Sequence, residues 1–369
     1  RNGRRTRQFI GRFFSGRVGK NLVSGVEIQF CKILIMLKLK YIVFFIGLTI
    51  FISSCFQEED AMTLPPTSGD LEVGVAEMTD DYRYHIYYDL ATNTAAKSVL
   101  NTAWDLGFAC SDTTWQIVLN NSKAMFAGNT GIKDFSAVTS ASDVKFEFDA
   151  ASGNKDSLAI RQWLDISGEN PVATGFVYII DRGTDENFLH IGYKKVVFET
   201  PGKDNYKIRF ANLDGSGEQV VTLKKDSVKN FVCFSFDNGI VDVEPPKKEW
   251  TLLFTTYQTV LYTNQGEAVP YLVRGALLNP YLTAAGVDSS LVFSEINLTD
   301  TVKFNLTTRR DVIGHEWKYY DFDEGIYRVE PDKNYIIRGQ DSYYYKLRFI
   351  SYYNNLNQKG YPSFEFMRM

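Results

Sequence analysis

The three histidines of this 369-residue chain are the residues best suited to acid–base or metal chemistry. They lie far apart, at His85, His190 and His315. His315-Glu316 begins like a zinc-protease motif, but Tyr319 stands four residues after His315, so the second histidine of that motif is missing. No Gly-x-Ser-x-Gly elbow of a serine hydrolase occurs in the sequence. We therefore expect a protein that is not an enzyme.

Cys55 ends a segment with the features of an exported precursor. Lys38 and Lys40 form a basic start, residues 41–52 are largely apolar, and Ser53-Ser54 precede the cysteine. An apolar run this short is typical of a signal peptide, because a membrane span takes about 20 residues. The small residues before Cys55 resemble the bacterial lipobox, which implies cleavage before Cys55 and lipidation of its thiol. The alternative is a buried N-terminal element with a chance cysteine.

The flanking residues extend this pattern. We predict that residues 1–54 are an upstream extension plus the lipoprotein signal peptide. The basic stretch 1–35 either precedes the true translation start or is a nucleic-acid-binding arm. Residues 55–80 are predicted as an acidic tether, because Gln57-Glu58-Glu59-Asp60 follows the cysteine closely. This cluster resembles the surface-display signal of lipoproteins of the Bacteroidetes, which implies a lipid-anchored outer-membrane protein facing the cell exterior. A solvated linker is the alternative.

The charge of the chain limits its possible binding partners, and its few cysteines limit its possible disulfides. Residues 1–54 hold 10 of the 40 basic and 1 of the 44 acidic residues, so the remainder carries a formal net charge of −13. An acidic surface argues against binding to nucleic acid, which needs a concentrated basic footprint. Cys110 and Cys233 lie in apolar runs and are predicted as buried thiols, with one disulfide between them as the alternative.

The elements that position these residues are predicted to be strands. Aromatic residues make up 15% of the chain, and short alternating runs are separated by Gly, Asn and Asp. In Tyr345-Lys346-Leu347-Arg348-Phe349 the aromatic and apolar residues alternate with basic ones, as in a half-buried strand. Residues 283–288 are the only weak candidate for a helix. The sequence predicts an all-β fold.

Several phrases occur twice, which indicates a duplication. Tyr206–Phe210 resembles Tyr345–Phe349, and Tyr178–Gly183 resembles Tyr335–Gly339. The strand at Phe231 corresponds to the strand at Tyr84, and the following tryptophans correspond as well, Trp250 to Trp104 and Trp317 to Trp163. We therefore predict two tandem antiparallel sandwich- or barrel-like domains, residues 81–225 and 226–369.

The order of motifs in the second half resembles the HmuY family, lipid-anchored all-β haem-binding proteins of Bacteroidetes. The motifs are Phe231–Gly239, Trp250–Tyr257, Gly275-Ala276, Trp317, Ile337–Gly339, Tyr345–Phe349 and Lys359–Phe366. The first half resembles the family more loosely, so the resemblance covers two HmuY-like domains. It implies haem capture at the cell surface and delivery to a TonB-dependent outer-membrane receptor.

The chain departs from the family at the iron ligands. The best-known members hold haem iron with two histidines, and the matching positions here are Gly168 and Phe322, which cannot ligate iron. Haem iron accepts His, Met, Cys or Tyr. The remaining candidate iron ligands are His315, Met125, His190 and His85. Each can also be a structural residue of a strand or core.

Tyr257, Tyr262 and Tyr271 are candidates for stacking on a porphyrin, although aromatic residues in strands more often belong to the core. Two functions remain open. One is binding of haem or a related metalloporphyrin for iron acquisition. The other is a surface adhesin, structural module or glycan-binding module that keeps the fold and has lost the haem site.

Overall fold

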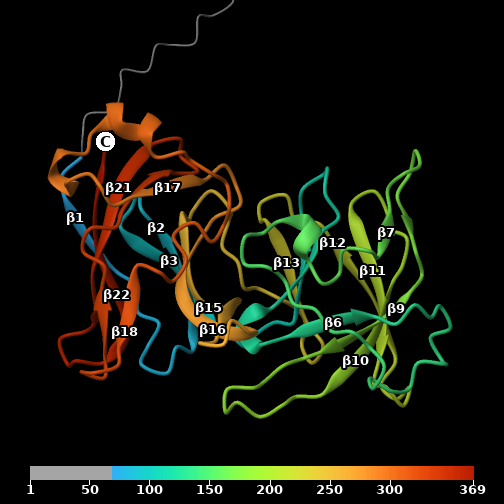
Figure 1. Ribbon diagram of the computed structural model, residues 1–369. Coiled ribbons are helices and arrows are strands. Elements are labelled where there is room, and N and C mark those ends of the chain that lie inside the picture. Colours follow the sequence, from blue (N-terminus) through green and yellow to red (C-terminus); the bar gives the residue numbers. More distant parts are fainter. Residues whose placement is uncertain (1–68) are drawn as a thin grey trace, which may run out of the picture. The chain divides into compact units, whose positions relative to one another are not determined.

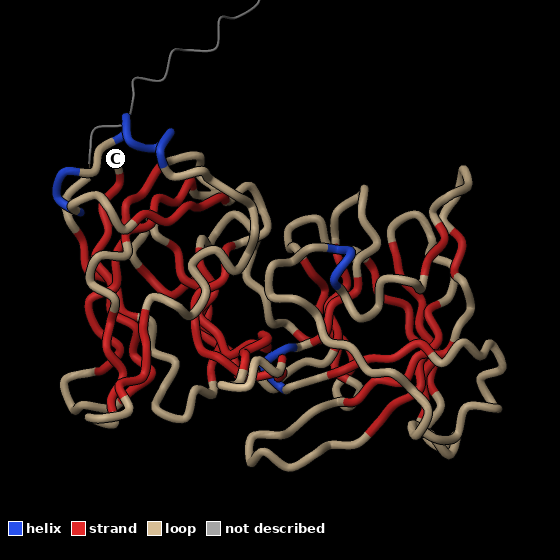
Figure 2. The backbone as a smooth tube through the Cα atoms, viewed as in Figure 1, coloured by secondary structure: helices blue, strands red, loops and turns tan. Residues whose placement is uncertain are grey.

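The computed structural model describes residues 69–369, which belong to one compact unit beginning at Pro65. Nearly all of its regular structure is strand, and helix is confined to short 3₁₀ turns (Figure 2). The predicted all-β fold is therefore confirmed. Among the described residues, no helix is both long and apolar enough to cross a membrane. The predicted signal peptide, Cys55 and the acidic cluster after it lie outside this range.

The strands form two lobes (Figure 1). The terminal lobe is built from both ends of the described chain. Its five-stranded sheet has the order β1 (Glu72–Val75), β22 (Lys359–Arg368), β21 (Tyr344–Tyr353), β20 (Asn334–Arg338), β17 (Ala284–Asp288). Its four-stranded sheet has the order β16 (Ala268–Leu278), β15 (Leu252–Tyr262), β2 (Tyr84–Asp89), β3 (Thr94–Leu100). The lobe also contains the hairpin β18 (Lys318–Asp321) with β19 (Ile326–Val329), and the turns η3 (Phe293–Glu295) and η4 (Leu298–Lys303).

The central lobe repeats this plan with residues from the middle of the chain. Its five-stranded sheet has the order β12 (Gln219–Lys224), β11 (Asn205–Ala211), β10 (Tyr193–Phe198), β9 (Val177–Asp181), β6 (Phe126–Asn129). Its four-stranded sheet has the order β14 (Gly239–Val241), β13 (Phe231–Ser235), β4 (Leu106–Ala109), β5 (Ile117–Leu119). The lobe also contains the hairpin β7 (Leu164–Asp165) with β8 (Val172–Ala173), and the turns η1 (Asn121–Lys123) and η2 (Lys155–Ser157).

The sheets do not divide at the predicted boundary after residue 225. Strand β2, from the predicted first domain, pairs with β15 of the second, and β13 of the second pairs with β4 of the first. Ile86 of β2 faces the terminal core and Val232 of β13 faces the central core. The two strands predicted to correspond have therefore exchanged lobes. That the chain arose by duplication stays a prediction.

Two shorter segments also differ from expectation. Residues 72–75 were assigned to the tether but form strand β1, which pairs with β22, and the adjacent Ala76 and Met78 are buried in the terminal core. The weak helix candidate at residues 283–288 is strand β17, paired with β20. In both places the pairing partner lies far away in the sequence, so a local pattern could not reveal it.

The sheet register corrects one of the predicted repeats. Lys346 of β21 lies opposite Ile336 of β20, and Lys195 of β10 lies opposite Ile179 of β9. Strand β10, not the Tyr206 strand β11, therefore occupies the place of the Tyr345 strand β21. Strand β11 follows β10 in the sheet order just as β22 follows β21. The similarity of Tyr206–Phe210 to Tyr345–Phe349 reflects a shared strand pattern instead of an equivalent position.

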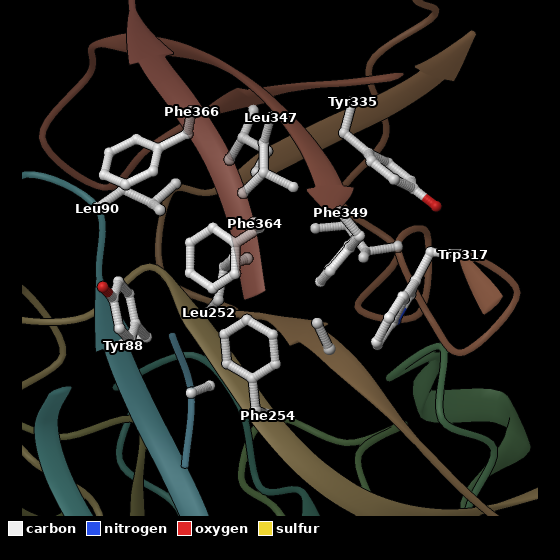
Figure 3. Close-up of a cluster of buried hydrophobic side chains, with 14 of the residues drawn as sticks. Tyr88, Leu90, Leu252, Phe254, Trp317, Tyr335, Leu347, Phe349, Phe364 and Phe366 are labelled. Atoms are coloured by element: carbon white, nitrogen blue, oxygen red, sulfur yellow. The ribbon is translucent and has the colours of Figure 1, made fainter. Parts of the chain in front are cut away.

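Aromatic rings from both sheets close the core of the terminal lobe (Figure 3). Phe254 of β15 stacks on Phe364 of β22 with ring centroids 5.4 Å apart, and Trp317 stacks on Phe349 at 3.9 Å. All four side chains are buried. Full burial of a large apolar side chain contributes about 1.5–3 kcal/mol, so these contacts hold the two layers together.

The four-stranded sheets of the two lobes meet through a further buried cluster. It combines Tyr87 and Leu253 of the terminal lobe with Cys233 of the central lobe, and Trp250 lies among them. The ring of Tyr87 meets Trp250 edge-on at 5.0 Å. This surface between the lobes encloses the most deeply placed of the hollows described below.

Candidate functional site

A cavity of about 100 Å³ lies between the lobes. Both lobes contribute to it, the terminal lobe with His85, Tyr87 and Trp250 and the central lobe with Trp104 and Cys233. Small-molecule sites usually have volumes of about 300–1,000 Å³, so this interlobe cavity is too small for a porphyrin.

His85, one of the predicted iron ligands, lies in the wall of the interlobe cavity and is only 3% exposed. Its Nε2 accepts a hydrogen bond from Trp104 Nε1 at 3.2 Å, so its proton resides on Nδ1, which donates to Thr255 Oγ1 at 2.7 Å. Burial and the nearby Arg310 lower the pKa of His85 to about 3. The ring is neutral, and both of its nitrogens are occupied.

His315 lies at a second, larger hollow of about 340 Å³. This His315 hollow is lined by Tyr257, Thr259 and the segment 307–316, part of which bridges to β16 through Gly314 and Ala276. His315 Nδ1 lies 3.3 Å from the hydroxyl of Tyr257. Within residues 69–369 no hydrogen-bond partner of His315 Nε2 is found. Burial lowers the pKa of His315, with the charge of Lys318 adding to the effect, which favours the neutral, ligating form.

His190 lies on the loop between β9 and β10, at a third hollow of about 460 Å³. Its Nε2 lies 2.8 Å from Asp181 Oδ1, so the nitrogen farther from the backbone is occupied. The floor of this His190 hollow includes Lys123 and Arg182, whose charges are paired with Asp105. The hollow is therefore polar and charged. The His315 hollow also has charged residues in its lining, Arg309, Asp311 and Glu316, so polarity does not distinguish the two.

Met125 has no access to any of these hollows, because its side chain is fully buried in the central-lobe core. It follows Ala124, which adopts a left-handed conformation at the end of η1. In this arrangement Met125 packs as a core residue, and its sulfur cannot reach a ligand without unfolding of that core.

The three tyrosines predicted to stack on a porphyrin differ in position. Tyr257 is buried, whereas Tyr262 and Tyr271 are 74% and 57% exposed. Tyr271 of β16 lies opposite Thr259 of β15, and residues directly opposite in an antiparallel pair share a face. Tyr271 and Tyr257 therefore lie on the face that borders the His315 hollow, while alternation places Tyr262 on the other face.

A disulfide, the alternative to two buried thiols, does not form between the two cysteines. Cys110 and Cys233 are free and buried. Cys110 packs in the central-lobe core, whereas Cys233 packs in the cluster between the lobes, on the other face of the same sheet. Side chains that point to opposite faces of a sheet cannot be bridged without moving the backbone. The interpretation of both residues as buried thiols is confirmed.

Some polar residues of these sites were not singled out from the sequence. Asp105 accepts from Lys123 Nζ at 2.5 Å and from Arg182 Nη2 at 3.1 Å, and all three side chains are buried. Arg310 reaches the interlobe cavity from the terminal lobe. The Ile-Asp-Arg-Gly motif that contains Arg182 was a usable signal, because a charged residue at the end of an apolar strand needs a partner.

A family model described as HmuY protein matches residues 81–366 of the chain. Two solved structures are also similar: apo PinO from Porphyromonas gingivitis and the apo HmuY analog TFO of Tannerella forsythia. Apo PinO is 11% identical, with 81% of this chain and 98% of that chain covered and a TM-score of 0.26. TFO is 9% identical, with 83% and 98% covered and a TM-score of 0.24. No curated protein matches the chain.

The family match runs through both lobes without a break at residue 225. It covers more than half of the chain, from the residues before β2 to the middle of β22. This match confirms the resemblance to the HmuY family that was expected from the sequence. The confirmation does not depend on the structural similarities, whose TM-scores are low. The chain belongs to the HmuY family.

Proposed function

We propose that this protein binds haem or a related metalloporphyrin at the His315 hollow, with His315 as an iron ligand. Membership in the HmuY family supports haem as the ligand class. The observation that carries the choice of site is the free Nε2 of His315 in a hollow of about 340 Å³. Of the predicted ligands, His85 and Met125 are buried, and Nε2 of His190 is occupied.

The surroundings of His315 suit an axial ligand. A metal-ligating histidine usually donates its other ring N–H to a fixed acceptor, and the Tyr257 hydroxyl stands at that place. Tyr271 offers an exposed ring on the same face of the β15–β16 hairpin. In this proposal His315 holds the iron, Tyr257 orients the imidazole, and Tyr271 covers part of the porphyrin.

The proposed cellular role follows from the same family. The protein would be attached to the outer membrane through lipidated Cys55, face the cell exterior, and pass haem to a TonB-dependent receptor for iron acquisition. It would act as a binding protein and not as an enzyme. Incorporation of labelled lipid in cells tests the anchor, and labelling that persists in Cys55→Ser would overturn it.

Titration of the purified protein with haemin tests the site. We expect a Soret shift in the wild type and binding weakened about tenfold or more in His315→Ala, the usual range for disturbing a metal site. His190→Ala is the matched control, because that histidine also borders a hollow and also lacks a second histidine beside it, although it is more exposed than the half-buried His315. An unchanged spectrum in His315→Ala removes His315 as ligand. No Soret shift in either oxidation state removes haem binding.

A second function is favoured by one observation. Among the residues that line the His315 hollow, no other His or Met is present to supply a second axial ligand. Exposed tyrosines on a hairpin can stack on sugar rings, and Tyr262 and Tyr271 are both exposed. A glycan-binding or adhesin role therefore remains the alternative if haemin does not bind. Binding to a glycan array that is lost in Tyr271→Ala would then support it.

A further inference from the structure

The interlobe cavity combines an apolar wall with several polar groups whose hydrogen-bonding capacity is not fully used, among them Arg310 and Trp250, and also Asn121 Oδ1 and Thr256 Oγ1. Its wall includes the rings of Tyr87 and Trp250 and the side chain of Leu253. Ligand sites typically have such a lining, mostly aromatic or apolar with a few placed polar groups. The cavity of about 100 Å³ has room for a ligand of only a few non-hydrogen atoms.

Arg310 provides a positive charge that forms no direct ion pair with a described residue, although the charge of Glu244 acts on it. Its backbone N–H donates to Ser152 of the central lobe at 3.0 Å, and its Nε donates to the carbonyl of Leu278 at 3.2 Å. In the part of the chain that the structure describes, its Nη1 and Nη2 have neither a hydrogen-bond acceptor nor an ion-pair partner. Arg310 is half-buried, and a guanidinium whose terminal N–H groups lack an acceptor is suited to receive an anion.

Trp250 provides an unused donor in the same wall. It is 1% exposed, and its Nε1 has no hydrogen-bond partner in the described structure. Trp104, the tryptophan at the corresponding position of the central lobe, donates its Nε1 to His85. Buried indole N–H groups usually have a partner, so the missing acceptor of Trp250 is informative.

The acidic residues of the cavity make no direct contact with Arg310, although the charges of Glu244 and Arg310 act on each other. Glu244 accepts from the backbone N–H groups of Asn230 and Phe231 at 3.0 and 2.8 Å. Asp149 accepts from the backbone N–H groups of Leu119 and Ala159 at 2.6 and 2.8 Å. Both carboxylates therefore accept hydrogen bonds from backbone N–H groups, Glu244 from those at the start of β13 and Asp149 from others in the central lobe. Neither forms an ion pair with Arg310.

We propose that the interlobe cavity binds a short-chain monocarboxylate of about two to four carbons, its carboxylate held by Arg310 and by the indole N–H of Trp250. The short alkyl chain packs against Tyr87 and Leu253. The guanidinium sets the charge of the ligand, the indole adds a directed donor, and the volume sets the length. This cavity shares the wall residue Tyr257 with the His315 hollow, but Arg310 and Trp250 do not line that hollow, and the proposal does not depend on haem binding there.

Propionate is the probe, and propionamide is its neutral match of nearly the same shape. Isothermal titration and tryptophan fluorescence of the wild-type protein are expected to show saturable propionate binding. We expect propionamide to bind at least tenfold more weakly, because it carries no charge for Arg310. Benzoate is expected to bind more weakly as well, because its ring exceeds the cavity. Equal binding of propionate and propionamide, or no saturable binding, overturns the proposal.

Substitutions of Arg310 and Trp250 test whether these two residues hold the carboxylate of propionate. Arg310→Met is expected to weaken propionate binding at least tenfold and Trp250→Phe by a few-fold, whereas Arg310→Lys keeps part of the affinity. Arg161→Met is the matched control, since Arg161 lies at the surface beside Glu147. If Arg310→Met unfolds, the Trp250→Phe result decides. Unchanged propionate affinity in Trp250→Phe and in whichever arginine variants fold overturns the site.

Discussion

The two lobes place different polar groups at the same point of the same architecture. The residue after the first lobe tryptophan is Thr251 in the terminal lobe and Asp105 in the central lobe. Thr251 Oγ1 accepts from the backbone N–H of Leu90 at 3.3 Å, and Asp105 Oδ2 accepts from the equivalent N–H of Phe236 at 2.8 Å. The main-chain bond is thus conserved between the lobes while its acceptor changes from a hydroxyl to a carboxylate.

The type of acceptor determines which side chains must lie next to it. Thr251 is satisfied by neutral Gln340 and by Asp89. The Asp105 carboxylate, being buried, requires cations, and it has Lys123 and Arg182. Arg182 in turn pairs with Asp237 at the rim of the His190 hollow. One architecture therefore accommodates either a hydroxyl or a carboxylate acceptor at this point, provided that every buried group is satisfied.

The largest expected effect comes from breaking the ionic centre. Asp105→Ala leaves Lys123 and Arg182 buried without their shared anion, which costs about 3–5 kcal/mol of unfolding free energy. Thr251→Ala in the terminal lobe removes the hydroxyl that bonds to Gln340, Asp89 and the Leu90 N–H but leaves no buried cation unpaired, and it costs about 1–2 kcal/mol. Urea denaturation of both variants measures the difference. Similar losses in the two variants would show that the ionic centre has no special requirement for Asp105.

The next effect concerns carboxylates that have no cation. Burial raises the pKa of Glu244 to about 7 and that of Asp149 to about 6. The folded protein therefore holds these protons more tightly than the unfolded chain does. Their contribution to stability is fully present below the unfolded pKa of about 4 and is lost as pH rises through 6 and 7. Each group changes the unfolding free energy by roughly 3 kcal/mol.

Unfolding measured in urea between pH 5 and pH 8 is expected to show stability falling with rising pH. Glu244→Gln serves to assign part of the slope, because the amide does not titrate. A slope that is equally steep in this variant would place the titration elsewhere, and a flat profile in the wild type would contradict both raised pKa values.

The local sequence pattern was sufficient to predict where strands form but not which strands pair with each other. The alternation at Tyr345–Phe349 predicts strand β21 correctly, because period two is a property of the strand alone. The same alternation cannot tell which sheet a strand joins. Strands β2 and β13 have similar apolar patterns, so the sequence gives no reason for β2 to pair with β15 rather than with β4.

The candidate sites also depend on contacts that a local sequence pattern does not reveal. His85 is visible in the sequence, but its partners Thr255 and Trp104 lie 170 and 19 residues away. Arg310 stands beside Arg309 and has no local feature that distinguishes it, although Arg309 is exposed and paired with Asp311 whereas Arg310 reaches the cavity. Chemistry that depends on contacts between lobes becomes visible only when the fold is known.

The two corresponding tryptophans give a smaller and sharper test. Trp104→Phe removes the donor to His85 Nε2 and leaves a buried acceptor unsatisfied, which costs about 1–3 kcal/mol in addition to the lost ring volume. Trp250→Phe removes an N–H that has no partner in the described structure, so only the volume is lost. Denaturation should therefore show Trp104→Phe as the less stable variant by about 1 kcal/mol or more. The reverse order would mean that the Trp250 N–H is used in the folded protein.

The smallest difference is expected at the corresponding buried lysines, Lys195 and Lys346. Each ammonium donates to loop carbonyls beneath its sheet. Lys195 donates to one, Val138 at 3.0 Å, and Lys346 to two, Phe293 at 3.1 Å and Ile296 at 2.9 Å. A hydrogen bond to a charged group contributes about 1.5–3 kcal/mol, and methionine keeps most of the side-chain volume.

Lys346→Met therefore leaves two carbonyls without their donor, against one in Lys195→Met. We expect both variants to be destabilised, with Lys346→Met lower by about 1 kcal/mol in urea denaturation. Hydrogen exchange should locate the loss in residues 293–296 for one variant and near residue 138 for the other. Equal losses would mean that a single carbonyl acceptor is enough to hold each loop, since the second bond of Lys346 would then add nothing to the stability of the terminal lobe.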